Sequence, residues 1–147
     1  MRKGAGQARS VSFVLARVLL VDADLTSRLT LQTVLQAGGY KVDAAASAAE
    51  AVGKLDEREY ELVLSDLRME SPSAGLKVLA HARMMDYKPA TALITTYRQA
   101  NSRGNAKDNR AVLIEPEDLP ELLSKVADLI SERATRKVER ELRQARN

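Results

Sequence analysis

The sequence predicts a three-layer α/β fold, in which helices cover both faces of a parallel β-sheet. Five short runs of apolar residues that favour strands recur along the chain, and helical patterns lie between most of them. The runs are almost wholly apolar rather than alternating, as expected for strands that are buried on both faces. The five expected strands are RVLLV (17–21), KVDAA (41–45), ELVLS (61–65), TALIT (91–95) and AVLIE (111–115).

The spacing of apolar residues predicts four helices, two of which have recognisable end signals. Gly38 and Gly39 form a stop signal for the first helix, and Ser47 with Glu50 forms a capping box that opens the second. The segment 97–110 is polar, so we expect a loop or at most a short helix there. The apolar positions expected to mark the helices are Leu25, Leu29, Val34 and Leu35 in the first, Val52 and Leu55 in the second, Leu76, Leu79, Ala80 and Met84 in the third, and Leu122, Leu123, Val126, Leu129 and Ile130 in the last, which begins near Leu119.

Composition restricts the kind of protein. A chain of 147 residues corresponds to one domain and is long enough to bury a core. The absence of cysteine excludes disulfides and thiolate metal sites, and the single histidine, His81, argues against a zinc site. No apolar stretch approaches the roughly 20 residues of a membrane-spanning helix, and we find no secretion signal, so we expect a cytoplasmic protein without membrane association.

Charge divides the chain into three parts. Residues 1–17 carry four basic residues and no acid, residues 18–130 hold 13 basic and 17 acidic residues, and residues 131–147 hold six basic and three acidic residues. We therefore predict a basic N-terminal extension (1–16), one folded domain (17–130) and a charged helical C-terminal extension (131–147). No nucleic-acid-reading motif or aromatic platform accompanies the basic residues, so nucleic-acid binding is not expected.

Acidic and hydroxyl side chains follow the expected strands at the points where the strands end. Asp22 and Asp24 follow the first strand, Asp66 follows the third, Thr95 ends the fourth, and Glu115 ends the fifth. The carboxyl ends of parallel strands meet at one edge of the sheet, which is where such folds bind ligands. Carboxylates at this edge favour a hard cation and chemistry on a carboxylate. They argue against a flavin phosphate, which prefers a Gly-rich loop.

The segments RVLLVDADLTSR, ELVLSDLRM, GLKVL, ALITTY and VLIEPEDLPELLSKV together resemble the response-regulator receiver domain of two-component signalling. The resemblance covers about residues 17–130. It implies a doubly wound, flavodoxin-like, five-stranded sheet in the order 2-1-3-4-5, and a signalling module rather than an enzyme. It also implies that Asp66 accepts a phosphoryl group from a sensor histidine kinase or a phosphotransfer protein. Mg²⁺ would then be held by Asp22 and Asp66, and the Thr95 hydroxyl would contact the phosphoryl group.

The sequence departs from the family pattern at the expected site. Ala23 stands where the family usually has a second metal-binding acid. Asp24 could partly replace that acid, although we favour its alternative role as the N-cap of the next helix. Glu115 stands where the family has a lysine that offsets the charge of the phosphoryl group. The loop after Asp66 carries one more residue before Gly75 than is usual.

Two functions therefore remain open. The first is a working receiver of atypical sequence, with Asp66 as phosphoacceptor. The second is a pseudo-receiver that acts as a protein-interaction or dimerisation module without phosphorylation, with residues 97–130 as the expected face of a homodimer. Sequence does not name the cognate kinase or the output.

Overall fold

The structure is a computed structural model that describes residues 15–67, 69–95, 113–114 and 118–146, with only the backbone described at 113–114. Parallel strands form one sheet in the order β2-β1-β3-β4-β5. The elements are β1 (Arg17–Val21), α2 (Leu25–Ala37), β2 (Lys41–Ala45), α3 (Ala48–Glu57), β3 (Leu62–Asp66), α4 (Ala74–Arg83), β4 (Ala90–Ile94), β5 (Leu113–Ile114) and α5 (Leu119–Arg146). The predicted parallel α/β sheet with helices on both faces is confirmed.

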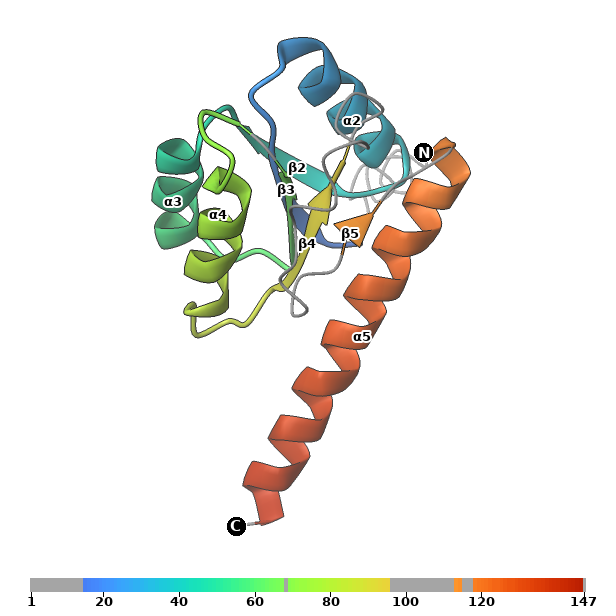
Figure 1. Cartoon of the computed structure of the whole chain (residues 1–147). Helices are drawn as coiled ribbons and strands as arrows, with labels where there is room; N and C mark the ends of the chain where they lie inside the picture. Colours follow the sequence, from blue (N-terminus) through green and yellow to red (C-terminus); the bar gives the residue numbers. More distant parts are fainter. Residues whose placement is uncertain (1–14, 68, 96–112, 115–117, 147) are drawn as a thin grey trace, which may run out of the picture.

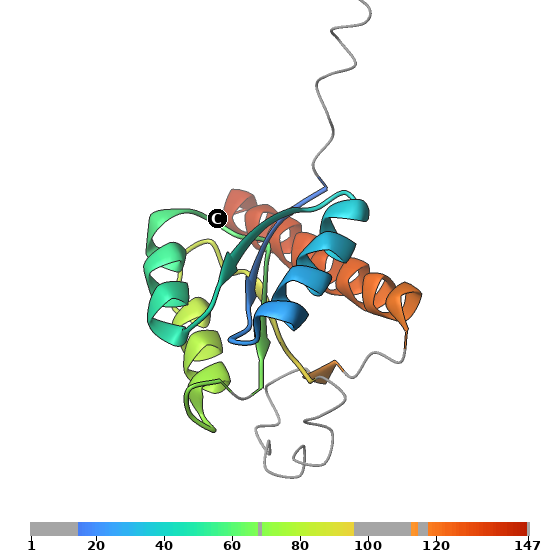
Figure 2. The same ribbon diagram turned by 90° about the horizontal axis from the view of Figure 1, so that it is seen from above.

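The sheet separates two hydrophobic cores. In Figures 1 and 2, α3 and α4 cover one face of the sheet, and α2 and α5 cover the other. Val18 and Leu20 of β1 belong to the core under α2 and α5, whereas Leu19 and Val21 belong to the core under α3 and α4. Successive side chains of a strand point to opposite faces, so an unbroken apolar run supplies both cores at once.

Two helices begin at side-chain caps. The Asp24 carboxylate accepts a hydrogen bond from the backbone N–H of Ser27 at 2.8 Å, and the Ser47 hydroxyl accepts one from the N–H of Glu50 at 3.1 Å. Both contacts satisfy N–H groups that have no partner within the helix. After α2 the chain reverses at Gly39, whose φ of +102° favours glycine.

Some boundaries and helix faces differ from those predicted. β3 spans 62–66 instead of 61–65, and β4 spans 90–94 instead of 91–95, because a pattern of side chains does not reveal where strand pairing begins. Two helices are also rotated relative to the predicted stripes. The predicted core positions that lie exposed are Leu25, Leu29, Ala80 and Met84. α4 buries its small residues instead, with Ala74, Gly75 and Ala82 beside Val78 and Leu79.

The last helix continues well past the predicted domain. α5 is 28 residues long, and its lower part extends away from the sheet in Figure 1. Arg133, which the sequence places in the extension, is only 9% exposed. Its Nε donates to the carbonyl of Lys88 at 3.0 Å, and its Nη2 donates to the carbonyl of Tyr87 at 2.7 Å. The helix is thus attached to the turn before β4.

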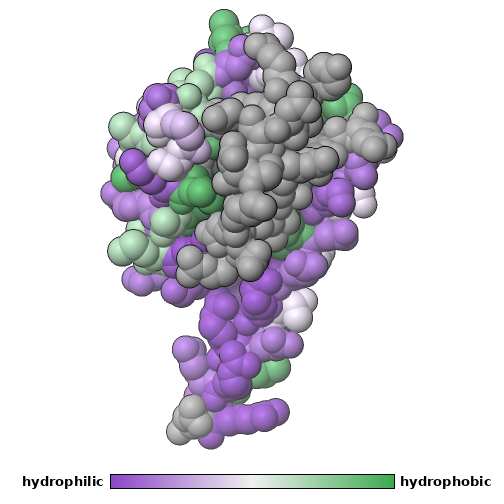
Figure 3. Space-filling model, in the orientation of Figure 1, coloured by the Kyte–Doolittle hydropathy of each residue, from purple (hydrophilic) through white to green (hydrophobic). Residues whose placement is uncertain are grey.

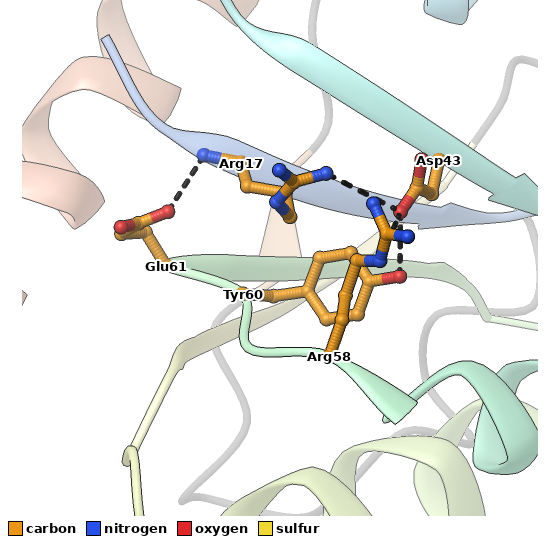
Figure 4. A network of polar contacts seen from close by, with 5 residues as sticks. All are labelled: Arg17, Asp43, Arg58, Tyr60 and Glu61. Carbon is orange, nitrogen blue, oxygen red and sulfur yellow. Dashed lines mark hydrogen bonds and ion pairs between the residues drawn. The ribbon is translucent and has the colours of Figure 1, made fainter. Parts of the chain in front are cut away.

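A polar network ties the sheet together near the amino ends of its strands. Figure 4 shows Asp43 of β2 facing the Tyr60 hydroxyl and two guanidinium groups. Tyr60 donates to Asp43 at 2.7 Å, and Arg17 and Arg58 lie 3.8 and 3.9 Å from the same carboxylate. Burial and the neighbouring carboxylate raise the pKa of Tyr60. These contacts join β2 to residues at or before the starts of β1 and β3.

No helix in the described part of the chain is long and apolar enough to cross a membrane.

Candidate functional site

Two carboxylates and a hydroxyl meet at the carboxyl edge of the sheet. Asp22 directly follows β1, Asp66 is the last residue of β3, and Thr95 directly follows β4. Asp66 pairs in register with Ile94, so Thr95 lies one residue beyond it on the neighbouring strand. Asp22, Asp66 and Thr95 are 1%, 4% and 4% exposed. Polar side chains are rarely buried this deeply without a specific role.

The electrostatics of Asp22 are unfavourable. Burial raises the pKa of Asp22, the negative charge of Asp24 raises it further, and hydrogen bonds to the Asp24 N–H and the Asp66 side chain partly oppose this. Asp22 Oδ1 accepts from the Asp24 N–H at 3.0 Å, whereas Oδ2 is buried and has no hydrogen-bond partner among the described residues. A buried carboxylate oxygen in this state is one that a cation would stabilise.

The residues next to Asp22 make contacts other than metal ligation or have no polar side chain. Asp24 is the N-cap of α2 and its carboxylate binds the Ser27 N–H. Ala23 is exposed and has no polar side chain to offer. Arg28, which the sequence did not single out, donates from Nη1 to the carbonyl of Asp22 at 2.7 Å, and its charge lowers the pKa of Asp22. The only feature of the sequence that could have pointed to Arg28 is its position one turn into the helix that follows Asp22 and Asp24.

The loop after Asp66 is held close to the strand by Gly75. A Cβ on Gly75 would lie 2.3 Å from the carbonyl oxygen of Asp66 and 3.0 Å from that of Leu67. Only glycine permits this approach, because both obstructing atoms belong to the backbone. Glu70 is directed elsewhere, since its carboxylate accepts from the N–H of Ala48 at the start of α3 at 3.1 Å.

The site can offer a metal ion two carboxylates. Among the described residues there is no group of three or more His, Cys, Asp or Glu side chains that could hold a metal. Two carboxylates nevertheless suffice for Mg²⁺, which usually keeps several water molecules and takes one or two protein carboxylates. The buried, unpartnered Oδ2 of Asp22 beside Asp66 fits such an ion.

Several predictions fall outside the described residues. Glu115, the polar segment 97–110 and the ends of the fifth strand at 111–112 and 115 lie there. The structure therefore leaves the charge at position 115 and the homodimer face at 97–130 as predictions.

A known protein family accounts for most of the chain. Residues 18–127 match the model of the response regulator receiver domain. The chain belongs to the response-regulator receiver family. The receiver resemblance seen in the sequence is confirmed, and the family places the chain in two-component signalling as a regulatory module. The same family supports a flavodoxin-like fold for residues 18–127.

Curated relatives of the receiver are larger proteins. The chain is 29% identical over 107 residues to the transcriptional regulatory protein ZraR of Klebsiella oxytoca, covering 71% of this chain and 24% of that protein. It is 29% identical over 119 residues to the sensory/regulatory protein RpfC of Xanthomonas campestris, covering 77% of this chain and 16% of that protein. The chain thus spans about a quarter or less of the length of these relatives.

Solved structures of receivers share the fold. A response regulator receiver protein from Sinorhizobium medicae has a TM-score of 0.68 at 22% identity, over 84% of this chain and 98% of that one. The response regulator TrrA of Thermotoga maritima, solved in complex with Mg(2+)-BeF, has a TM-score of 0.59 at 25% identity, over 78% of this chain and 99% of that one.

Proposed function

We propose that the receiver takes part in phosphorelay signalling by accepting a phosphoryl group on Asp66, from a sensor histidine kinase or a phosphotransfer protein. One observation carries the proposal: two buried carboxylates, Asp22 and Asp66, lie together at the edge of the sheet where Thr95 directly follows β4. Burial of two charges costs stability, and we take its presence here as support for a functional role.

The chemistry needs a carboxylate and a hydroxyl in these places. A carboxylate oxygen of Asp66 attacks the phosphorus of a phosphohistidine, the P–N bond breaks as the P–O bond forms, and the leaving imidazole nitrogen takes a proton. The hydroxyl of Thr95 can then donate a hydrogen bond to the phosphoryl group. Asp22 remains ionised to face the cation that offsets the added negative charge.

Asp22 and Asp66 are the residues that would hold Mg²⁺. When bound, the ion supplies positive charge against the incoming phosphoryl oxygens. In this proposal Asp24 acts as the cap of α2, where one of its carboxylate oxygens accepts from the Ser27 N–H, and it contributes no ligand. The receiver is therefore atypical in its metal ligands at Ala23 and in its charge at Glu115.

The test is intact mass after incubation of the full chain with acetyl phosphate and Mg²⁺. Wild type is expected to gain a phosphoryl adduct, whereas Asp66→Asn gains none. Asp24→Asn serves as a matched control, since asparagine also caps helices, and it should be labelled like wild type. Loss of the adduct in Asp24→Asn would contradict the assigned ligand set.

A second function is favoured by the small number of acidic side chains that the described residues offer to a metal ion. A pseudo-receiver that binds partners or a second copy without phosphorylation would need no third acid, and the described residues provide none. This function predicts no adduct on folded wild type under conditions that label a conventional receiver in parallel. It also predicts that Asp66→Asn leaves partner binding unchanged.

A further inference from the structure

A basic hollow lies at the end of the sheet opposite the acids. It has a volume of about 340 Å³ and lies between the end of α4, the start of β4 and the lower half of α5. Thr91 of β4 lies on its wall, four residues before Thr95, so about 13 Å of extended chain separates the two. The hollow is therefore distinct from the edge that carries Asp22 and Asp66.

The described residues around this hollow carry an excess of positive charge. Arg83, Lys88, Arg136 and Arg140 line it, and Glu132 is the acid among them. Arg136 and Arg140 belong to the basic C-terminal extension, whereas Arg83 and Lys88 belong to the preceding domain, which carries more acids than bases. The hollow thus brings cations of the domain together with cations of the extension. Guanidinium groups bind phosphate oxygens through paired N–H donors, and a lysine adds a further point charge.

The walls of the hollow are held in place by the attachment of α5. Lys88 adopts a φ of +47°, a left-handed conformation that is costly for a residue with a side chain. Arg133 binds the carbonyls of both Tyr87 and Lys88. Arg136 and Arg140 lie one and two turns later in α5, and the backbone that carries them is thereby held against the turn at Lys88. A fixed backbone lowers the ordering cost of binding an anion, and only the long side chains then lose rotamer freedom.

The neighbouring surface does not extend this basic character. A second hollow on the other side of α5 is lined by Lys137 and Arg140, but also by Glu59, Asp86 and Glu141. On the face that Figure 3 shows, the projecting part of α5 is predominantly hydrophilic. A ligand suited to the first hollow is therefore compact and strongly anionic, because an extended chain would meet these acids.

We propose that this hollow binds a small anion with two or more phosphate groups, either inorganic polyphosphate or the phosphate groups of a nucleoside polyphosphate. The four cations that line the hollow outnumber its one acid, so a ligand with more than one negative charge suits it electrostatically. The volume of the hollow suits a small ligand. The two sources share the recognised chemistry, and only the nucleoside part distinguishes them.

Isothermal titration calorimetry of the full chain with inorganic triphosphate and with ATP, both without Mg²⁺, tests the proposal. We expect dissociation constants below about 1 mM at low salt, weakening as salt is added. Equal affinities would assign recognition to the phosphates alone, and tighter binding of ATP would add contacts to the nucleoside. Asp66→Asn should bind both as wild type does, which separates this site from phosphorylation.

Two pairs of substitutions on the same helix localise the site. Arg136→Gln with Arg140→Gln is expected to weaken triphosphate binding by about tenfold. Arg143→Gln with Arg146→Gln removes the same charge from exposed positions outside the hollow and should leave binding within about twofold. Circular dichroism checks that both variants keep α5.

Three results would overturn the proposal. The first is an absence of binding to either phosphate compound below about 1 mM. The second is an equal loss of affinity in both variant pairs, which would reveal unspecific attraction to a basic helix. The third is tight binding of duplex DNA or poly-glutamate with no measurable binding of triphosphate, which would assign the cations to a macromolecule.

Discussion

At the scale of single residues, Asp22 is a buried carboxylate in electrostatically unfavourable surroundings. Its folded-state pKa is raised above the ordinary 3.8 by burial, so the folded protein binds a proton more tightly than the unfolded chain does. The free energy of unfolding therefore falls as the pH rises from 3.8 through the folded-state pKa, and it stays lower above that value.

Asp22→Asn is accordingly expected to stabilise the protein at neutral pH by about 1 kcal/mol. Asparagine keeps the acceptor for the Asp24 N–H and can place an amide donor beside Asp66. Urea unfolding should show the gain at about pH 7.5 and show it vanish near pH 3.5, where aspartate is protonated in both states. Added Mg²⁺ should stabilise wild type more than the variant.

Asp43→Asn is the matched control, because that carboxylate has Tyr60, Arg17 and Arg58 as partners. The same chemical change there should destabilise the protein by about 1 kcal/mol. If Asp22→Asn also destabilised the protein in the absence of divalent cations, the account of Asp22 as a strained carboxylate would be wrong.

The sequence predicts which edge of the sheet carries the acids, but it does not predict which groups these acids contact. Asp22 and Asp66 could be predicted because each directly ends an apolar run. Asp24 could be assigned to a cap or to a metal, and the hydrogen bond from Ser27 shows the cap. Arg28 and Arg133 could not be found, because a basic residue on a helix is usually exposed and its partners here are backbone carbonyls.

At the scale of elements, the contact between α4 and β3 depends on one glycine. Gly75→Ala is expected to destabilise the protein by about 2–3 kcal/mol, because its Cβ would lie 2.3 Å from the carbonyl of Asp66. It should also reduce phosphorylation by moving the Asp66 backbone. Urea unfolding and the acetyl phosphate assay measure the two effects.

Gly53→Ala provides the comparison within a neighbouring helix. A Cβ there meets nothing within 4 Å, and alanine is the better helix former, so a gain of up to about 1 kcal/mol is expected. Similar losses at both glycines would mean that helix flexibility, rather than the close approach to Asp66, sets the requirement.

The attachment of α5 is a second property of elements. Arg133→Met keeps much of the side-chain length but leaves the carbonyls of Tyr87 and Lys88 without their donors, so we expect a loss of about 1–3 kcal/mol. Arg143→Met, at an exposed position of the same helix, should stay within about 0.5 kcal/mol of wild type. Equal effects in urea unfolding would contradict a specific attachment.

The strands were easier to predict than the faces of the helices. β1 lies where its apolar run places it, since a strand buried on both faces needs apolar side chains throughout. β2 also has the predicted bounds, but it is an edge strand with Lys41 exposed and Asp43 half-buried. Leu25 and Met84 were predicted to face the core but are exposed, because α2 and α4 bury only part of their apolar residues. α4 instead packs its small residues against the sheet, and small residues carry little hydrophobic signal.

At the scale of the whole molecule, we expect the boundary of the folded domain to lie beyond residue 130, because Arg133 attaches α5 to the turn before β4. A chain that ends at Arg140 keeps Arg133 within a continued helix and should unfold within about 0.5 kcal/mol of the full chain. A chain that ends at Ile130 loses the attachment and should be less stable by about 2 kcal/mol. Equal stability of the two in urea would place the boundary where the charge pattern first put it.

Arg133 also fixes one point of the long helix α5, about which the part that follows could pivot. The 13 residues from Ala134 to Arg146 extend about 20 Å past this point at 1.5 Å per residue. A tilt of about 10° at Arg133 would then displace the end of α5 by about 3 Å, more than a side-chain rearrangement at the sheet edge would produce there directly. A small change in the turn at Lys88 would thus become a lever movement at the far end of the chain.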